Sequence, residues 1–169
     1  MIDVEDFIFR GILWAALKVA LFYYFCRGGA WYMAWKEIEH TADVGFEVET
    51  QSLNDLFIEA AFALYGVCYG DISVLRGIRH GSHETIMIDG IDLEELMVSW
   101  LNELIYIWES KNVLFIPLHV NVKRGSWHLE ADGLFAVYRQ IQLPIKAATY
   151  GGLVIRGEPR PFLRIFLDV

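Results

Sequence analysis

Cysteine is scarce in this chain of 169 residues, which contains only Cys26 and Cys68. Neither cysteine belongs to a group with metal-ligand spacing, so neither a disulfide framework nor a thiolate zinc site is indicated. This composition is typical of proteins from a reducing compartment. We therefore expect a cytoplasmic protein.

Basic residues are also few, because 14 Lys and Arg face 22 Asp and Glu and give a formal net charge of −8. Proteins that bind nucleic acid normally present a basic face to the phosphate backbone. Strong direct binding to nucleic acid is therefore not expected. The charge favours a basic protein or a cation as the partner.

The sequence lacks the short motifs of common enzyme families. It has no glycine-rich phosphate loop, no nucleophile elbow, and no Cys/His/Asn or Ser/His/Asp arrangement that spacing would define. His80 and His83 lie close together in a polar stretch, but without a third ligand they indicate solvated side chains.

One long apolar run, Phe7–Cys26, is long enough to cross a bilayer, although Arg10 and Lys18 interrupt it. Acidic residues precede it, where a secretory signal has basic ones. Three interpretations remain: a membrane anchor, a helix packed on the domain, or a translated leader before a true start at Met33. We favour the leader, because a strand pattern follows Met33 directly. Residues 1–32 would then be an extension, and residues 33–169 would form the domain. A membrane is not expected as a partner unless residues 7–26 are a real anchor.

The chain does contain a repeated pattern of one strand followed by one amphipathic helix. The first unit has a strand at Phe46–Glu49 and a helix capped by Ser52. The second has a strand at Ile86–Ile88 and a helix capped by Asp92, 40 positions after Ser52. The same offset aligns strand, cap and helix without a gap. Because neither unit can bury its helix alone, the two should share a core or interlock.

The remainder of the chain is predicted to be mostly strand. Together with the two helices, this pattern predicts an α+β fold with mixed sheets and two main helices, with Trp100 and Trp108 in the core. The predicted strands are Val113–Lys123, Trp127–Ala131, Ile145–Arg156 and Phe162–Val169, with turns at Arg124-Gly125 and near Asp132-Gly133.

Two isolated carboxylates lie at predicted strand ends. Asp43 lies between a strand predicted at Ala34–Glu39 and the strand at Phe46–Glu49, where an aspartate usually forms an Asx-turn, and Asp168 lies on the polar face of the last strand. If the sheet brings them together, they could form an all-oxygen site with main-chain carbonyls or the terminal carboxylate of Val169. Such a site suits calcium or magnesium.

Six blocks of sequence occur in a defined order between about Met33 and the last residue. They are His40–Gly45, Ser52-Leu53 with Leu56-Phe57 and Ala60-Ala61, Asp92–Leu96, Trp100–Tyr106, Ile145–Tyr150 and Phe166–Val169. In this order they resemble the archease family. The first and fourth blocks together are too specific for a chance match.

The resemblance implies a fold of two strand-helix-strand-strand (SHS2) modules, one inserted in the other, and a non-enzymatic function. Archeases assist the RtcB-type RNA ligase in tRNA splicing by promoting its guanylylation and multiple turnover. The family's ligands for a divalent cation correspond to Asp43 and Asp168, with Val169 adjoining. Lys146, and His40 in the block of Asp43, are the expected partner-contact residues.

Two other functions remain open on the sequence. A stand-alone metal-dependent hydrolase could use Asp43 and Asp168, although no general base with a defined position accompanies them. The second open function is that of a small-molecule-binding or membrane-tethered interaction module.

The sequence departs from the family pattern at three places. Gly151 stands where a histidine is usual, Ser99 where an acid is common, and residues 133–144 lack the usual Gly-Glu start. Any role of that histidine is therefore in doubt here.

Overall fold

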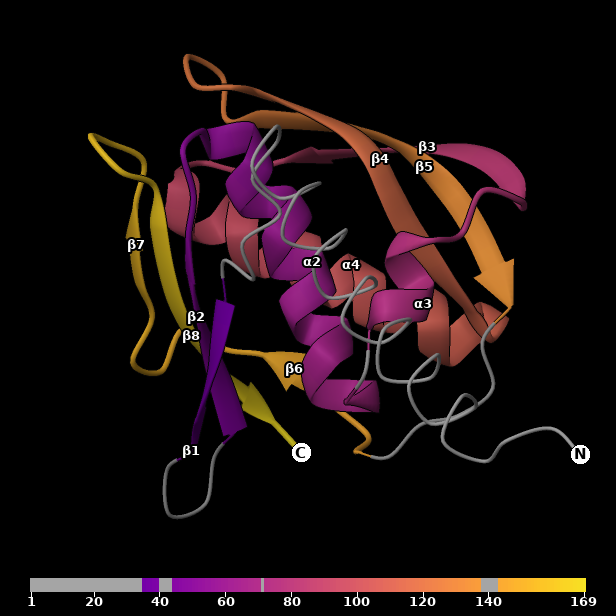
Figure 1. Ribbon diagram of the computed structural model, residues 1–169. Helices are drawn as coiled ribbons and strands as arrows, with labels where there is room; N and C mark the ends of the chain where they lie inside the picture. Colours follow the sequence, from indigo (N-terminus) through magenta and orange to yellow (C-terminus); the bar gives the residue numbers. More distant parts are fainter. Residues whose placement is uncertain (1–34, 40–43, 71, 138–142) are drawn as a thin grey trace, which may run out of the picture. The chain divides into compact units, whose positions relative to one another are not determined.

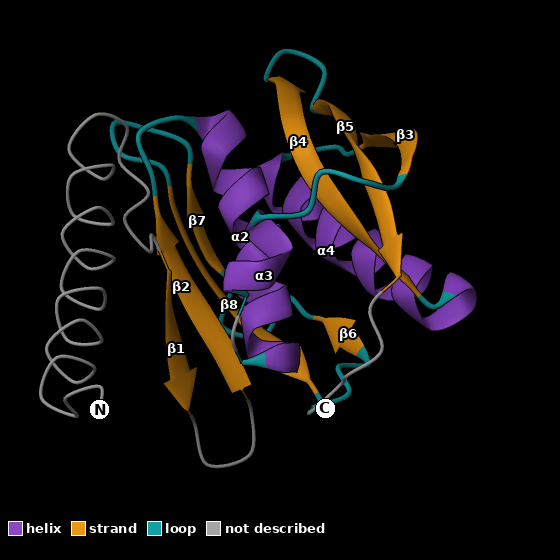
Figure 2. Ribbon diagram, turned by 45° about the vertical axis from the view of Figure 1, so that its right-hand side comes forward, coloured by secondary structure: helices purple, strands orange, loops and turns teal. Residues whose placement is uncertain are grey.

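The computed structural model describes residues 35–39, 44–70, 72–137 and 143–169, all within one compact unit, Ala34–Val169. Two β-sheets lie on either side of a layer of helices (Figures 1 and 2). All the strand pairs are antiparallel. The predicted α+β class is confirmed. The described sheets are antiparallel, whereas mixed sheets were predicted.

Strand β8 is the central strand of the first sheet. It pairs with β2 on one side and with β6 and β7 on the other. Its side chains alternate as predicted, with Leu163, Ile165 and Leu167 buried. The strands of this sheet are β1 (Trp35–Glu39), β2 (Val44–Glu49), β6 (Ala147–Ala148), β7 (Val154–Arg156) and β8 (Phe162–Asp168).

Helix α2 (Leu53–Tyr69) is the centre of the core. Ser52 caps it by accepting a hydrogen bond from the Asp55 amide at 3.1 Å, and Gly70 ends it with a φ of 78°. The helix contacts β2, the second sheet and the other long helix. It is therefore apolar on almost all sides, as expected for a helix with no broad solvent face.

The second module is inserted between α2 and β6. It contains β3 (Ser82–Asp89), α4 (Leu93–Lys111), β4 (Val113–Lys123) and β5 (His128–Val137), and its sheet has the order β3-β5-β4. This is a strand-helix-strand-strand module, and β2, α2, β7 and β8 form the other. The repeat predicted two units that share a core or interlock, and the family resemblance implied that one module is inserted in the other; both are confirmed.

Two side-chain hydrogen bonds tie the modules together inside the core. Trp100 is completely buried on α4, and its Nε1 donates to the Phe57 carbonyl of α2 at 2.9 Å. Tyr65 of α2 donates its hydroxyl proton to the Phe115 carbonyl of β4 at 2.7 Å. The prediction that Trp100 and Trp108 belong to the core is confirmed.

Three local predictions were wrong. The turn predicted near Asp132-Gly133 is part of continuous strand β5, where a side chain at Gly133 would collide with the Ile116 carbonyl and the Phe115 ring. The single strand predicted over Ile145–Arg156 is interrupted between β6 and β7, where Gly152 has a φ of 69°. The polar stretch after Gly70 also contains a short helix, α3 (Ser73–Arg76), that was not predicted.

Candidate functional site

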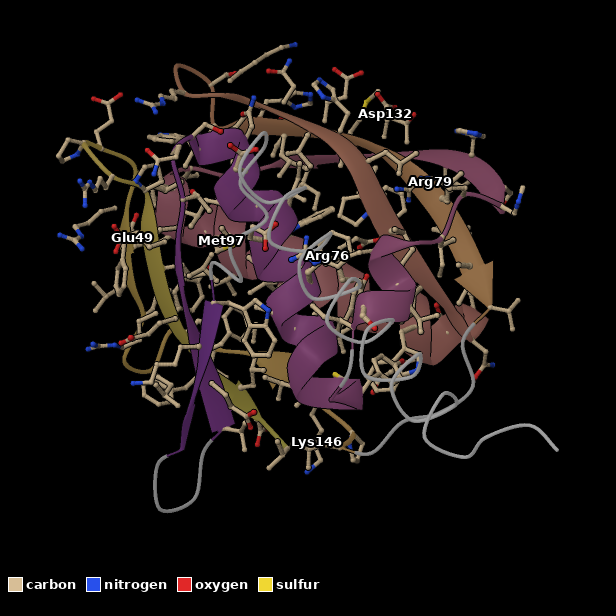
Figure 3. The ribbon with its side chains drawn as sticks, viewed as in Figure 1. Glu49, Arg76, Arg79, Met97, Asp132 and Lys146 are labelled. Atoms are coloured by element: carbon tan, nitrogen blue, oxygen red, sulfur yellow. The ribbon has the colours of Figure 1, made fainter. Side chains whose placement is uncertain are left out.

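The candidate site lies where β8 ends beside β6. Ala147 pairs with Asp168, and the backbone N–H of Lys146 donates to the Asp168 carbonyl at 2.8 Å. Two predicted site residues, Lys146 and Asp168, are thus brought together although 21 residues separate them in the chain. Figure 3 shows Lys146 at the edge of the molecule, beyond β6.

The side chain of Lys146 points along this edge to Val169. Its Nζ donates to the Val169 carbonyl oxygen at 2.7 Å. The carboxylate of Asp168 is exposed to solvent, so the site is an accessible edge. The Lys146 ammonium group, the Asp168 carboxylate and the backbone oxygen of Val169 therefore lie at one edge that a partner or a cation can reach.

The first residue of strand β2 lies beside the same part of β8. Val44 pairs with Leu167, the residue before Asp168, and Glu39 of β1 pairs with Val44. The remaining predicted site residues, Asp43 and His40, lie outside the described residues.

Asn102 of α4 fixes the position of β6. Its side-chain Nδ2 donates to the Ala148 carbonyl at 3.1 Å, and its Oδ1 accepts from the Ala148 N–H at 2.8 Å. The amide thus pairs with a strand edge as another strand would. Asn102 belongs to the Trp100–Tyr106 block, but no role was predicted for it; the available signal was an amide on the half-buried face of α4.

Replacing Asn102 with alanine should loosen β6 without unfolding the protein. Both backbone groups of Ala148 lose their partner, and an unpaired buried group costs about 1–3 kcal/mol. We expect a loss of about 2 kcal/mol in urea unfolding and faster exchange of the Ala148 amide proton. Asn121→Ala, at an exposed position of β4, is the control, and unchanged exchange at Ala148 in the Asn102 variant would contradict the role.

Oxygen atoms are the donors that this site offers to a metal. Among the described residues, no group of three or more His, Cys, Asp and Glu side chains could hold a metal ion. The Asp168 carboxylate and the Val169 carbonyl are hard ligands, so they fit calcium or magnesium better than zinc.

In the described ranges, the buried cysteine and the two nearby histidines do not form a competing site. Burial raises the pKa of the Cys68 thiol to about 12, so the thiolate is scarce at neutral pH and Cys68 is a poor nucleophile or ligand. His80 and His83 are exposed, in agreement with solvated side chains. Within the described part of the chain, no helix is both long and apolar enough to cross a membrane.

The turn after β6 places an exposed tyrosine beside the N-terminus of α4. Tyr150 is 57% exposed, and partial desolvation together with the charges of Glu95 and Asp92 raises its pKa. Gly151 follows, and a Cβ there would meet no atom closer than Thr149 Oγ1 at 3.7 Å. The position where the family usually has a histidine therefore has room for a side chain.

Comparison with known proteins shows the family of this chain. The model of the archease protein family matches residues 35–169. An archease from Methanopyrus kandleri is 32% identical over 132 residues, covering 75% of this chain and 91% of that protein. An archease from Methanosarcina barkeri is 32% identical over 125 residues, covering 70% of this chain and 83% of that protein.

Two solved structures share the fold. The solution structure of protein 1598 of Methanobacterium thermoautotrophicum has a TM-score of 0.62 at 21% identity and covers 82% of this chain and 100% of its own. The crystal structure of an archease from Thermotoga maritima, described as a possible chaperone, has a TM-score of 0.51 at 23% identity and covers 79% and 96%. From the family match and the identity to its relatives, this chain belongs to the archease family.

Proposed function

We propose that this protein is a non-enzymatic activator of an RtcB-type RNA ligase in tRNA splicing, and that it promotes guanylylation and repeated turnover of the ligase. Membership of the archease family supports the kind of activity. The observation that carries the proposal is the pairing of Lys146 with Asp168 at the end of β8. These residues come from two separate blocks of the family pattern and form one exposed edge.

The proposed site would hold a divalent cation, calcium or magnesium, through Asp168, Val169 and Asp43. The oxygen donors of Asp168 and Val169 fit such a cation. When bound, the cation would supply positive charge for phosphate oxygens, which is a principal contribution of metals to nucleotidyl transfer. Because Lys146 already donates to the Val169 carbonyl, a cation has to share that oxygen with the ammonium group or displace it.

Lys146 has a separate part in this proposal. Its backbone is held by Asp168, and its side chain ends in a positive charge at the edge of the molecule. That charge can contact a phosphate or an acidic group of the ligase. His40 is proposed as a second residue that contacts the ligase.

The test is ligation by the RtcB-type ligase of the same organism at a large excess of RNA over ligase. The Asp168→Asn variant should lower the joined RNA per ligase molecule, and the GMP bound to the ligase, by at least about tenfold, as expected when a metal ligand is lost. Because the Asp168 side chain is exposed, the midpoint of thermal unfolding of the variant should equal that of the wild type. Calcium titration of the isolated protein should show weaker binding by this variant.

Glu84→Gln is the matched control, because it removes one exposed negative charge from β3 in the other sheet. It should stimulate the ligase as well as the wild type does. Equal stimulation by Asp168→Asn and wild type would overturn the proposal. Hydrolysis of a phosphate ester or of RNA by the isolated protein, lost in Asp168→Asn, would instead indicate an enzyme.

A further inference from the structure

One face of helix α4 is open to solvent next to the candidate site. Glu95, Ser99, Asn102 and Tyr106 recur at helical spacing and are half-buried or exposed, whereas the other side of the helix is in the core. The hydrogen bonds of Asn102 hold β6 against this face. The strand that follows Lys146 is thus fixed alongside α4.

Two exposed tyrosines lie on this surface, which we call the α4–β6 face and define by Glu95, Glu103, Tyr106, Tyr150 and Gly151. Tyr106 is 60% exposed and Tyr150 is 57% exposed. Glu103 lies one turn before Tyr106 on the helix. Tyr150 is near enough to Glu95 for the two to interact electrostatically. Each tyrosine therefore has a carboxylate as its neighbour.

A tyrosine beside a carboxylate is well suited to bind arginine. The guanidinium group can stack on the ring and pair with the carboxylate at the same time, which the ammonium group of lysine does less well. Exposed tyrosines are enriched among residues that dominate protein–protein interfaces. The charge around them is strongly negative, because α4 contains four glutamates and, at its end, a single basic residue, Lys111.

We propose that the α4–β6 face docks an arginine-bearing surface of the RNA ligase, and that this contact places the Lys146–Asp168 edge against the ligase. The inference rests on the proposed function and adds the surface by which the partner is held. Its acidic character disfavours RNA, which carries the same sign of charge. Its continuity with β6, which pairs with the end of β8, connects docking to the candidate site.

The geometry of the helix also predicts the spacing of the arginines. Glu95 and Glu103 are eight residues apart on α4, which corresponds to about 12 Å along the helix axis. Two arginines on the partner should therefore lie about 12 Å apart. This distance fits two helical positions eight residues apart, or extended positions three to four residues apart.

Binding of the full-length protein to the ligase, measured by calorimetry or biolayer interferometry, tests this surface. Four single variants change it in different ways: Glu103→Lys, Tyr106→Ala, Tyr150→Ala and Gly151→Arg. Gly151→Arg adds a positive charge where the structure has open space, so folding should be unaffected. We expect the dissociation constant to rise by about tenfold in Glu103→Lys and Tyr106→Ala, as for central interface residues.

Matched controls lie on the other sheet. Glu84→Lys makes the same charge change as Glu103→Lys. Met87→Ala is the control for Tyr106→Ala, because Met87 is 65% exposed and Tyr106 is 60% exposed. Both should bind the ligase as tightly as the wild type. Wild-type binding should also weaken as salt is raised, because its charged contacts are screened.

The outcomes separate this inference from the proposed function. Asp168→Asn should still bind the ligase while failing to stimulate it, whereas the variants of the α4–β6 face should need more protein for half-maximal stimulation. Unchanged binding in all four variants, or equal weakening by Glu84→Lys, would overturn the docking surface and leave the proposed function standing. A wild-type protein that neither binds nor stimulates the ligase would overturn both.

Discussion

Replacing Trp100 with alanine is expected to lower the free energy of unfolding by about 3–5 kcal/mol, the usual cost of removing a buried tryptophan. Its side chain is completely buried, and its ring packs edge-on against Phe115 with 6.0 Å between the centroids. Its Nε1 also bonds to the Phe57 carbonyl of α2. One residue thus joins both long helices and the second sheet. Urea unfolding followed by circular dichroism measures the loss.

Trp100→Phe separates packing from hydrogen bonding. Phenylalanine keeps an aromatic ring in the core but lacks the N–H, so the expected cost is smaller, about 1–2 kcal/mol including the lost hydrogen bond. A loss below about 1 kcal/mol in Trp100→Ala would mean that the surrounding core closes over the cavity. The contribution assigned to this tryptophan would then be wrong.

Replacing Arg76 with methionine is expected to destabilise the protein by about 2–3 kcal/mol, below the range for a completely buried ion pair because Arg76 is partly exposed. The Arg76 guanidinium donates to both carboxylate oxygens of Glu59, at 3.0 and 2.6 Å, and lies 4.2 Å from the centroid of the Phe62 ring. Glu59 is only 8% exposed. Without Arg76, a buried carboxylate loses its compensating charge. Thermal unfolding of the variant at neutral pH measures the effect.

The double variant Glu59→Leu with Arg76→Met distinguishes an uncompensated charge from lost attraction. Replacing both partners with apolar side chains removes the buried charge, so this variant should be more stable than Arg76→Met alone. Arg124→Met breaks an exposed ion pair with Glu158 and should change stability by no more than about 1 kcal/mol. Equal losses in Arg76→Met and the double variant would contradict the explanation.

Much of the helical structure could be predicted from local sequence. Ser52 and Asp92 both cap helices through hydrogen bonds to the residue three positions later. These signals depend on residues adjacent in the chain. The offset between the two caps also predicted two units that share a core or interlock, because neither unit can bury its helix alone.

The errors concern residues whose role depends on distant neighbours. Gly133 follows an aspartate, as in many turns, but in β5 its missing side chain leaves room for Phe115 of the adjacent strand. Gly152 interrupts a predicted strand because its φ is positive, and sequence alternation does not reveal that conformation. The pairing direction of strands likewise depends on connections that lie far apart in the sequence.

For the candidate site, the structure brings two of the predicted residues together, whereas the residue that supports them was not predicted. The backbone N–H of Lys146 donates to the Asp168 carbonyl, although only the family resemblance indicated a link between these residues. The part played by Asn102 could not be predicted, because its partner Ala148 is 46 positions away. The predictions for Asp43 and His40 lie outside the described residues.

The pairing of β2 with β8 has a consequence for how the molecule is made. Paired residues of the two strands, such as Val44 and Leu167, are more than 100 positions apart in the sequence. The whole inserted module is synthesised between them. On the ribosome, the inserted module can fold before β8, the pairing partner of β2, has been synthesised, since domains fold as their residues emerge. Closing so long a loop is slow relative to local contacts. The edge that holds Lys146 and Asp168 should therefore be among the last parts of the nascent protein to form.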